Sequence, residues 1–295
     1  MEFLTAFPQM NNDTLTALKK FIDEGFRDFT RTYGDAIETF FDPLRRFLVA
    51  SERFLTGTSW IVILLLILAL VWLASRNWKI TLGSAAGLLV IGYFGMWEDT
   101  MKTVAITFVA TVISIVVGIP IGIAMSRWQR VQAAINPILD VMQTMPSFVY
   151  LIPVVMLLGI GRVPGLIAVV IYAIPPIIRL TNLGIRLVDK DMLEAADAFG
   201  SSSWQKLRNV QLPLALPTIM AGINQTIMMA LAMVVIAAMI GVQGLGQPVL
   251  RAISNQYFTL GVFNGFAIVG IAIIFDRASQ AFGKRLQKYT EVVHG

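Results

Sequence analysis

The sequence contains no cysteine, which excludes disulfide bonds and metal sites built from thiolates. Its single histidine, His294, lies next to the last residue, so a buried imidazole base or a histidine-ligated metal is nearly excluded. Charged residues make up only 14% of the chain, whereas a soluble domain of this size carries about a quarter. Hydrophobic residues make up 56%. This composition predicts an all-α polytopic protein that crosses a lipid bilayer several times.

Several chemical motifs are also missing. The sequence has no G-x-x-x-x-G-K-[ST] phosphate loop, so we do not expect it to bind ATP itself. No predicted span carries a carboxylate near its centre, because Asp140 and Asp276 fall towards span ends. We therefore expect no catalytic residue, no metal site and no cofactor in this chain, which leaves a pore or gate driven by another protein. Membrane topology explains the net charge of +5 better than nucleic-acid binding does.

The first 58 residues are predicted to form an extracytoplasmic N-terminal tail. Residues 1–35 are polar, whereas residues 36–55 place apolar side chains at helical spacing and charged side chains on other faces. This spacing predicts an amphipathic helix over 36–55. A helix lying at a membrane surface and a helix packed on protein fit the pattern equally well.

Long apolar runs begin at Trp60 and predict about seven transmembrane helices, because a span needs roughly 20 mostly apolar residues. The first two spans, over 59–96, are short and closely linked, so a re-entrant pair is an alternative for them. A permease-like core is then expected over 97–285, followed by a cytoplasmic tail over 286–295. The seven spans are expected at 59–75, 79–96, 103–126, 140–160, 163–182, 218–240 and 261–282.

Lysine and arginine residues predict the orientation, since they gather on the cytoplasmic side of a membrane protein. If the C-terminal tail is cytoplasmic, the inside segments hold thirteen of these residues and the short outside loops hold three. An odd number of spans then places the N-terminus outside. The seven basic residues of the N-terminal tail oppose this placement, although its nine acids make it net negative.

The largest predicted cytoplasmic loop covers residues 183–217 and is expected to contain two short helices. The alanine-rich stretch 193–199 favours the first helix, and Gly200 ends it because glycine adopts a left-handed conformation at little cost. Three serines at 201–203 supply a cap for a second helix over 204–210. Pro213 and Pro217 are expected to stop that helix. Such a pair of helices can dock in a groove of a partner.

The same loop carries the spaced motif EAA-x3-G-x9-[IV]-x-LP. Isolated EAA triplets are common in helices, but the full spacing resembles the EAA loop in the membrane subunits of bacterial ABC importers. The resemblance implies a type I ABC importer-like permease fold and a loop that contacts a separate cytoplasmic ATPase, which hydrolyses the ATP. In this interpretation the two alanines permit close approach and the glutamate offers a charge. The expected coupling residues are Glu194, Ala195, Ala196, Gly200, Leu212 and Pro213.

A second resemblance covers about 97–285 and is carried mainly by MQTMPSFVYLIP at 142–153, GIGRVPG at 159–165 and RLTNLGIR at 179–186. These segments look like the glycine betaine, proline betaine and choline branch of the importers. The resemblance implies a permease subunit in the bacterial inner membrane, working as two copies with ATPases and an extracytoplasmic substrate-binding protein. The choice among quaternary ammonium compounds stays open, as does the choice between choline uptake and osmoprotection.

Prolines interrupt the fourth and fifth predicted spans, and each proline leaves a backbone carbonyl without its helical donor. Broken backbone at membrane depth is tolerated where it lines a cavity. Free carbonyls and two aromatic side chains would suit a quaternary ammonium ion, although the aromatic residues also fit a packing role. The predicted translocation path comprises Pro146, Phe148, Tyr150, Pro175 and Pro176.

Two other functions remain open at this point. A stand-alone carrier or channel would transport without an ATPase, for example through sodium bound to free carbonyls. A membrane enzyme or scaffold is opposed only by the near absence of histidine and cysteine.

Overall fold

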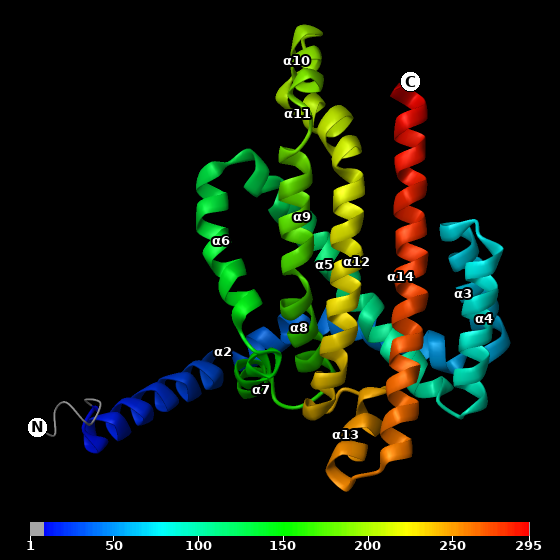
Figure 1. Ribbon diagram of the computed structural model, residues 1–295. Helices are drawn as coiled ribbons and strands as arrows, with labels where there is room; N and C mark the ends of the chain where they lie inside the picture. The colour runs from blue at the N-terminus through cyan, green and yellow to red at the C-terminus, as the bar shows by residue number, and fades with distance from the viewer. Residues whose placement is uncertain (1–8, 295) are drawn as a thin grey trace, which may run out of the picture.

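The computed structural model describes the backbone of residues 9–294 and the side chains of residues 9–285. Within this part of the chain, all regular structure is helical (Figure 1). Residues 1–8 of the expected tail and Gly295 lie outside the described residues. The long apolar runs of the sequence agree with this all-helical architecture, since a helix satisfies its own backbone hydrogen bonds within lipid.

The N-terminal helix is longer than the sequence analysis predicted. Helix α2 runs from Asn12 to Gly57, so the segment before residue 36, expected only to be polar, is helical as well. The physical reason lies in an apolar stripe that begins at Leu15 and continues through Leu18, Ile22 and Phe26 at helical spacing. The side chain of Asn11 caps the helix by accepting a hydrogen bond from the Asp13 N–H at 3.3 Å.

Four helical segments are long and apolar enough to cross a membrane, and the number rises to six if each of two bent helix pairs is one span. The described residues thus contain four to six candidate spans, and the finer expectation of about seven stays a prediction. One bent pair joins α2 to α3 (Trp60–Ser75) at 112°, and α4 (Trp78–Tyr93) is a shorter apolar helix. The four segments are Trp97–Arg127, Arg162–Arg186, Ser203–Ile240 and Phe258–Arg285.

The segment expected to form a straight span over 140–160 is bent, because the chain turns sharply inside it. Helix α6 (Gln129–Thr144) meets the following segment, η1 (Ser147–Tyr150) and α7 (Leu151–Leu158), at 113°. Pro146 disfavours a helical conformation at Met145, whose ψ of 133° is extended. A proline that was expected to expose one carbonyl within a span instead turns the whole chain.

Three elements form the centre of the molecule: α5 (Trp97–Arg127), α9 (Pro175–Arg186) and α12 (Leu212–Ala237) pack on one another. Gly122 permits the contact between α5 and α9, because a Cβ atom there would lie 2.6 Å from the Cβ of Thr181. Small residues at helix crossings let backbones approach closely within a membrane. The remaining elements surround this centre.

The molecule has two distinct ends (Figure 1). Helices α10 (Lys190–Ala198) and α11 (Ser203–Lys206) lie at the end where α14 (Phe258–His294) also finishes. Helices α2, α7 and α13 (Gly246–Asn255) lie at the opposite end. Helix α14 passes the expected boundary between core and tail at residue 285 without a break.

Candidate functional site

The EAA segment forms the first of two short helices at one end of the molecule. Asp189 caps α10 by accepting a hydrogen bond from the Asp191 N–H at 2.9 Å. The helix ends before Gly200, which has a φ of +75°. The expectation that Gly200 adopts a left-handed conformation to end this helix is confirmed, and a side chain at this position would be strained.

The second helix begins at the expected place but does not stop. Ser202 and Gln205 form a capping box, in which the Ser202 N–H donates to the Gln205 side chain at 2.8 Å. The helical run then continues from Ser203 to Ile240. The expectation that Pro213 and Pro217 would end it is wrong.

The reason lies in the positions of the two prolines. A π-helical segment, η2 (Leu207–Gln211), shifts the hydrogen-bond register just before α12. Pro213 is the second residue after this segment, so its missing N–H falls where the hydrogen-bond register has already shifted. Pro217 lies inside α12 and leaves only one carbonyl without its donor. The second loop helix is therefore continuous with a membrane-spanning helix.

Three contacts order this end and attach it to the rest of the molecule. Lys206 forms an ion pair with Asp197, which ties α11 to α10. The Arg127 guanidinium donates to the Ser203 carbonyl at 3.1 Å and ties α11 to α5. Leu207 is buried in the same core cluster as Met125. Since α11 is also continuous with α12, displacement of this end would act directly on α5 and α12.

The two alanines of the motif have different surroundings. Glu194 and Ala195 are exposed, whereas Ala196 is buried and packs inside the protein. Only Ala195 is thus free to allow close approach of another molecule. Gly200 is exposed at the tip, and Leu212 and Pro213 are half-buried at the base of α12.

Sequence reasoning missed the apolar residues at this tip. Phe199 is 91% exposed and Trp204 is 64% exposed. Loops that contact only solvent usually carry polar residues at such exposed positions, so these two side chains indicate a contact surface. Two large apolar side chains on either side of a glycine and a serine run were the available signal in the sequence.

The residues predicted for a translocation path do not converge on one cavity. Tyr150 is buried, its hydroxyl donates to the Met142 carbonyl, and its ring lies edge-on to Tyr172 with centroids 5.9 Å apart. Phe148 is 58% exposed, so the two aromatic side chains point to different surroundings. Tyr150 therefore packs against Tyr172 inside the protein and does not line a cavity together with Phe148.

The three prolines of the predicted path are also separated. Pro146 is exposed at the break between α6 and η1. Pro175 and Pro176 are buried at the first two positions of α9, where α8 (Arg162–Ala173) gives way to it. At the start of a helix a proline leaves no unpaired N–H, so this pair joins two helices rather than breaking one.

A network across distant segments holds the opposite end together. Arg162 donates to the Glu52 carboxylate at 2.6 Å and to the Gln243 side-chain oxygen at 3.0 Å. Glu52, in α2 and outside the four spanning segments, is only 10% exposed in its side chain. Burial raises the pKa of its carboxyl group, and the neighbouring Arg162 charge opposes that shift.

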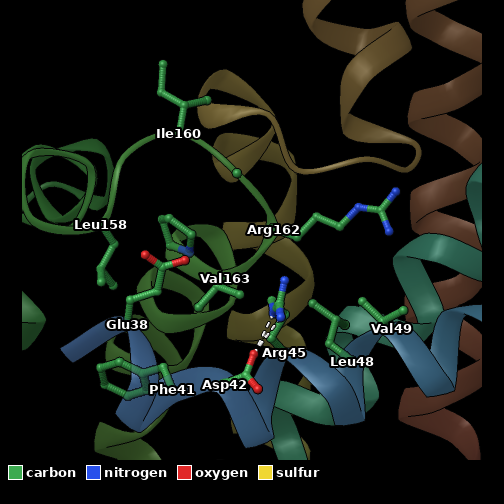
Figure 2. A pocket seen from close by; sticks show the side chains of 12 residues that line it. Glu38, Phe41, Asp42, Arg45, Leu48, Val49, Leu158, Ile160, Arg162 and Val163 are labelled. Carbon is green, nitrogen blue, oxygen red and sulfur yellow. Dashed lines mark hydrogen bonds and ion pairs between the residues drawn. The ribbon is translucent and has the colours of Figure 1, made fainter. Parts of the chain in front are cut away.

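A cavity of about 340 Å³ lies beside this network, between α2 and residues 158–164. Figure 2 shows Glu38 and Arg45 rising from α2 towards that segment, and Arg45 pairs with Asp42 at 2.7 Å. The Arg45 hydrogen bond lowers the pKa of the Asp42 carboxyl group. Among the residues that the structure describes, no group of three His, Cys, Asp or Glu side chains could hold a metal ion.

The fold is similar to that of a chain in a solved ABC transporter. The chain superposes on a solved structure of the MetNI methionine ABC transporter, in an inward-facing conformation, with a TM-score of 0.58. The sequence identity is 20%, and the match covers 63% of this chain and 93% of that one. A second crystal form of the same transporter gives a TM-score of 0.57. These matches show that the all-helical fold resembles that of an ABC transporter chain, and they carry no information on substrate.

The sequence itself defines the family. Residues 114–288, more than half of the chain, match the binding-protein-dependent transport system inner membrane components, and the chain belongs to this family. It is thus the membrane permease component of an ABC importer rather than an enzyme, as the two resemblances implied.

Individual relatives are similar over most of the chain. The glycine betaine/carnitine transport permease protein GbuB of Listeria monocytogenes is 48% identical over 77% of this chain and 81% of that protein. The glycine betaine transport system permease protein OpuAB of Bacillus subtilis is 46% identical over 89% and 93%. The glycine betaine/proline betaine permease ProW of Escherichia coli is 50% identical over 73% of this chain and 62% of its own length.

Proposed function

We propose that this chain moves a quaternary ammonium compound, choline or glycine betaine, across the bacterial inner membrane as the permease subunit of an ABC importer. The observation that carries the proposal is the 46–50% identity to three permeases named for glycine betaine transport. More distant relatives at 34–36% identity are named for choline, so choline remains a second candidate within the same class.

The proposed coupling site is the exposed surface of α10 and α11. Glu194, Ala195 and Gly200 would contact a separate cytoplasmic ATPase, and Phe199 and Trp204 would fill its groove. Leu212 and Pro213 would pass the displacement into α12, and Ala196 would hold α10 on the rest of the loop. The contacts of Arg127 and Leu207 support this role, because they connect the loop to α5 and to the central core.

The proposed assembly contains two copies of this chain, two ATPases and an extracytoplasmic binding protein. The family description supports the binding protein, since it names binding-protein-dependent transport. ATP itself would be bound and hydrolysed only on the partner ATPase. Closure of the ATPases would pull the α10–α11 units and swing the spanning helices between outward and inward cavities.

The proposed orientation places α10, α11 and the end of α14 in the cytoplasm and α2 outside. The distribution of lysine and arginine over the loops supports it. The α2 helix exposes apolar side chains such as Phe21 and Phe40 among charged ones. This pattern fits a helix that lies at the extracytoplasmic surface of the inner membrane. Accessibility of engineered cysteines in α2 and in α10 to an impermeant reagent would test both sides, since the chain has no cysteine of its own.

The test of function is uptake of radiolabelled glycine betaine and choline by cells in which the chain is deleted or restored. Loss of uptake on deletion and its return on complementation would support the proposal, and the better competitor would identify the substrate. Uptake that does not require ATP but depends on a sodium gradient would instead support a stand-alone carrier. Unchanged uptake of both compounds on deletion would refute the substrate assignment.

A further inference from the structure

An ion pair joins α6 to α9 within the spanning part of the molecule. The Arg179 guanidinium contacts the Asp140 carboxylate, and the two residues are 39 positions apart in the chain. Arg179 lies inside the Arg162–Arg186 span, seven residues before its end, which corresponds to about 10 Å along the helix axis. The sequence placed Asp140 towards a span end and offered no partner for it, so this pair was not predicted.

The pair is not covered by the rest of the chain. The Asp140 side chain is 65% exposed and the Arg179 side chain is 38% exposed. On the other face of α6, Leu139 is buried and packs with Ile135 on the central core, so Asp140 projects away from that core. Charged side chains at membrane depth avoid lipid and face a water-filled cavity or a protein partner. The exposed side of this pair therefore marks a surface that lipid does not cover.

Arg179 also has hydrogen-bonding capacity to spare. Within the described part of the chain, its Nε–H is buried and has no hydrogen-bond partner. Buried donors in proteins are nearly always satisfied, so an unpaired one next to an exposed ion pair needs an explanation. A carboxylate that approaches the guanidinium side-on takes Nε–H and an Nη–H together in a bidentate contact. Asp140 contacts only Nη2, so the buried Nε–H has no carboxylate partner while Asp140 is in place.

We propose that Asp140 and Arg179 form a site that recognises both charges of a zwitterionic substrate, a carboxylate and a quaternary ammonium group on a short linker. The substrate carboxylate replaces Asp140 on Arg179 and forms the bidentate contact. The released Asp140 carboxylate then faces the quaternary ammonium group, which has no N–H to donate and binds through charge alone. This inference rests on the proposed function and deepens it, because the site favours betaines over choline, which has no carboxylate.

The first test asks whether the pair faces water. Thr144 is exposed one helical turn after Asp140, and Val269 is exposed on α14 beside other apolar residues. Because the chain is free of cysteine, Thr144→Cys and Val269→Cys each give a single thiol. We expect the impermeant reagent 2-(trimethylammonium)ethyl methanethiosulfonate to label Thr144→Cys at least tenfold faster than Val269→Cys in membranes containing the whole transporter. Equal rates would overturn the proposal.

The second test measures uptake of glycine betaine per ATP hydrolysed, in proteoliposomes that contain the permease, its ATPase and saturating binding protein. Arg179→Lys keeps the charge but removes the bidentate edge, and Asp140→Asn removes the carboxylate charge. We expect each variant to lower uptake per ATP about tenfold, with ATP hydrolysis retained, since one lost charge-assisted contact has this effect. Glu24→Gln, which disrupts an exposed pair with Lys20 in α2, is the matched control.

A purely structural tie between α6 and α9 predicts a different pattern. The charge-swapped double variant, Asp140→Arg with Arg179→Asp, would then restore uptake, and this result would overturn the proposal. If the wild type takes up glycine betaine and Arg179→Lys retains its uptake per ATP, the inference fails and the proposed function stands. If the wild type takes up choline but no glycine betaine, the inference fails and the proposed function stands. If the wild type takes up neither compound, the proposed function fails and the inference fails with it.

Discussion

The two ends of the molecule differ in the contacts that order their elements, although Arg127 also joins the α10–α11 end to a distant segment through the Ser203 carbonyl. At the end formed by α10 and α11, the caps join residues only two or three positions apart, as between Asp189 and Asp191 or Ser202 and Gln205. At the opposite end, Arg162 binds Glu52 and Gln243, which are 110 and 81 positions away. Local contacts form whenever their short segment is ordered, whereas distant contacts form only when the whole fold is in place.

This difference predicts different consequences of substitution. A substitution in the α10–α11 end should alter the structure and contacts of that end and leave the stability of the other helices unchanged. A change in the distant network should lower the stability of the whole chain. Four substitutions test the contrast, in decreasing order of expected effect.

Gly200→Asp should cause the largest loss, a fall in uptake of more than about tenfold, because an unpaired carboxylate at a packed interface costs several kcal/mol. Nothing lies within 4 Å of the position of a Cβ at Gly200, so the fold and the membrane level should be retained. Radiolabelled uptake and immunoblots measure the two quantities. Gly95→Asp is the matched control, since Gly95 follows the end of α4 with a φ of +76°, the same helix-ending hydrogen bonds and equally open space. Equal losses in both variants would show that backbone strain, rather than coupling, is responsible.

Glu52→Gln should lower the free energy of unfolding by about 2 kcal/mol, because Arg162 loses a charge-assisted hydrogen bond in a largely buried setting. Unfolding of the purified protein in detergent measures this change. Glu24→Gln removes a charge from an exposed pair of the same helix and should cost about 0.3 kcal/mol. If the two variants are equally stable, the distant network does not stabilise the fold.

Ser202→Ala should cost about 1 kcal/mol, confined to the α11 end, because it removes the side-chain cap. Amide hydrogen exchange of residues 203–206 should accelerate about fivefold, with no change near Arg162. Ser203→Ala is the control, since the recorded contact of Ser203 uses its carbonyl rather than its hydroxyl. Acceleration at both ends of the molecule would contradict the view that this cap acts locally.

Lys206→Gln should have the smallest effect, about 0.5 kcal/mol, because its partner Asp197 is 57% exposed and surface ion pairs contribute little. High salt should reduce the difference from the wild type further. Hydrogen exchange of α10 at low and high salt measures both. An effect larger than that of Ser202→Ala would mean that the ion pair, rather than the cap, orders the two helices.

The parts of the molecule that could be predicted from sequence depend on local signals. The left-handed Gly200 and the cap at Ser202 each follow from the preferences of one or two residues. The four long spans follow from composition within a single window. Family membership follows from motifs whose spacing the sequence displays directly.

The errors have physical causes that act beyond such windows. Hydropathy cannot detect the turn at Pro146, because both sides of it are apolar and only backbone geometry distinguishes a bend from a span. Pro213 and Pro217 suggested a helix stop, but the outcome depended on the π-helical segment before them. Tyr150 and Phe148 are two residues apart, and packing against Tyr172 buries one and leaves the other exposed.

The sequence by itself determined the membrane class, the permease family and the loop with its caps, because each depends on composition or on contacts between near neighbours. Only the tertiary structure decided that Glu52 and Gln243 meet Arg162, and that Asp140 meets Arg179. A charged residue in a sequence has many possible partners. The entropy cost of closing a loop varies only slowly with its length, so it does not single out one of them. The packing of α5, α9 and α12 places those partners, because close helix contacts leave each side chain few neighbours.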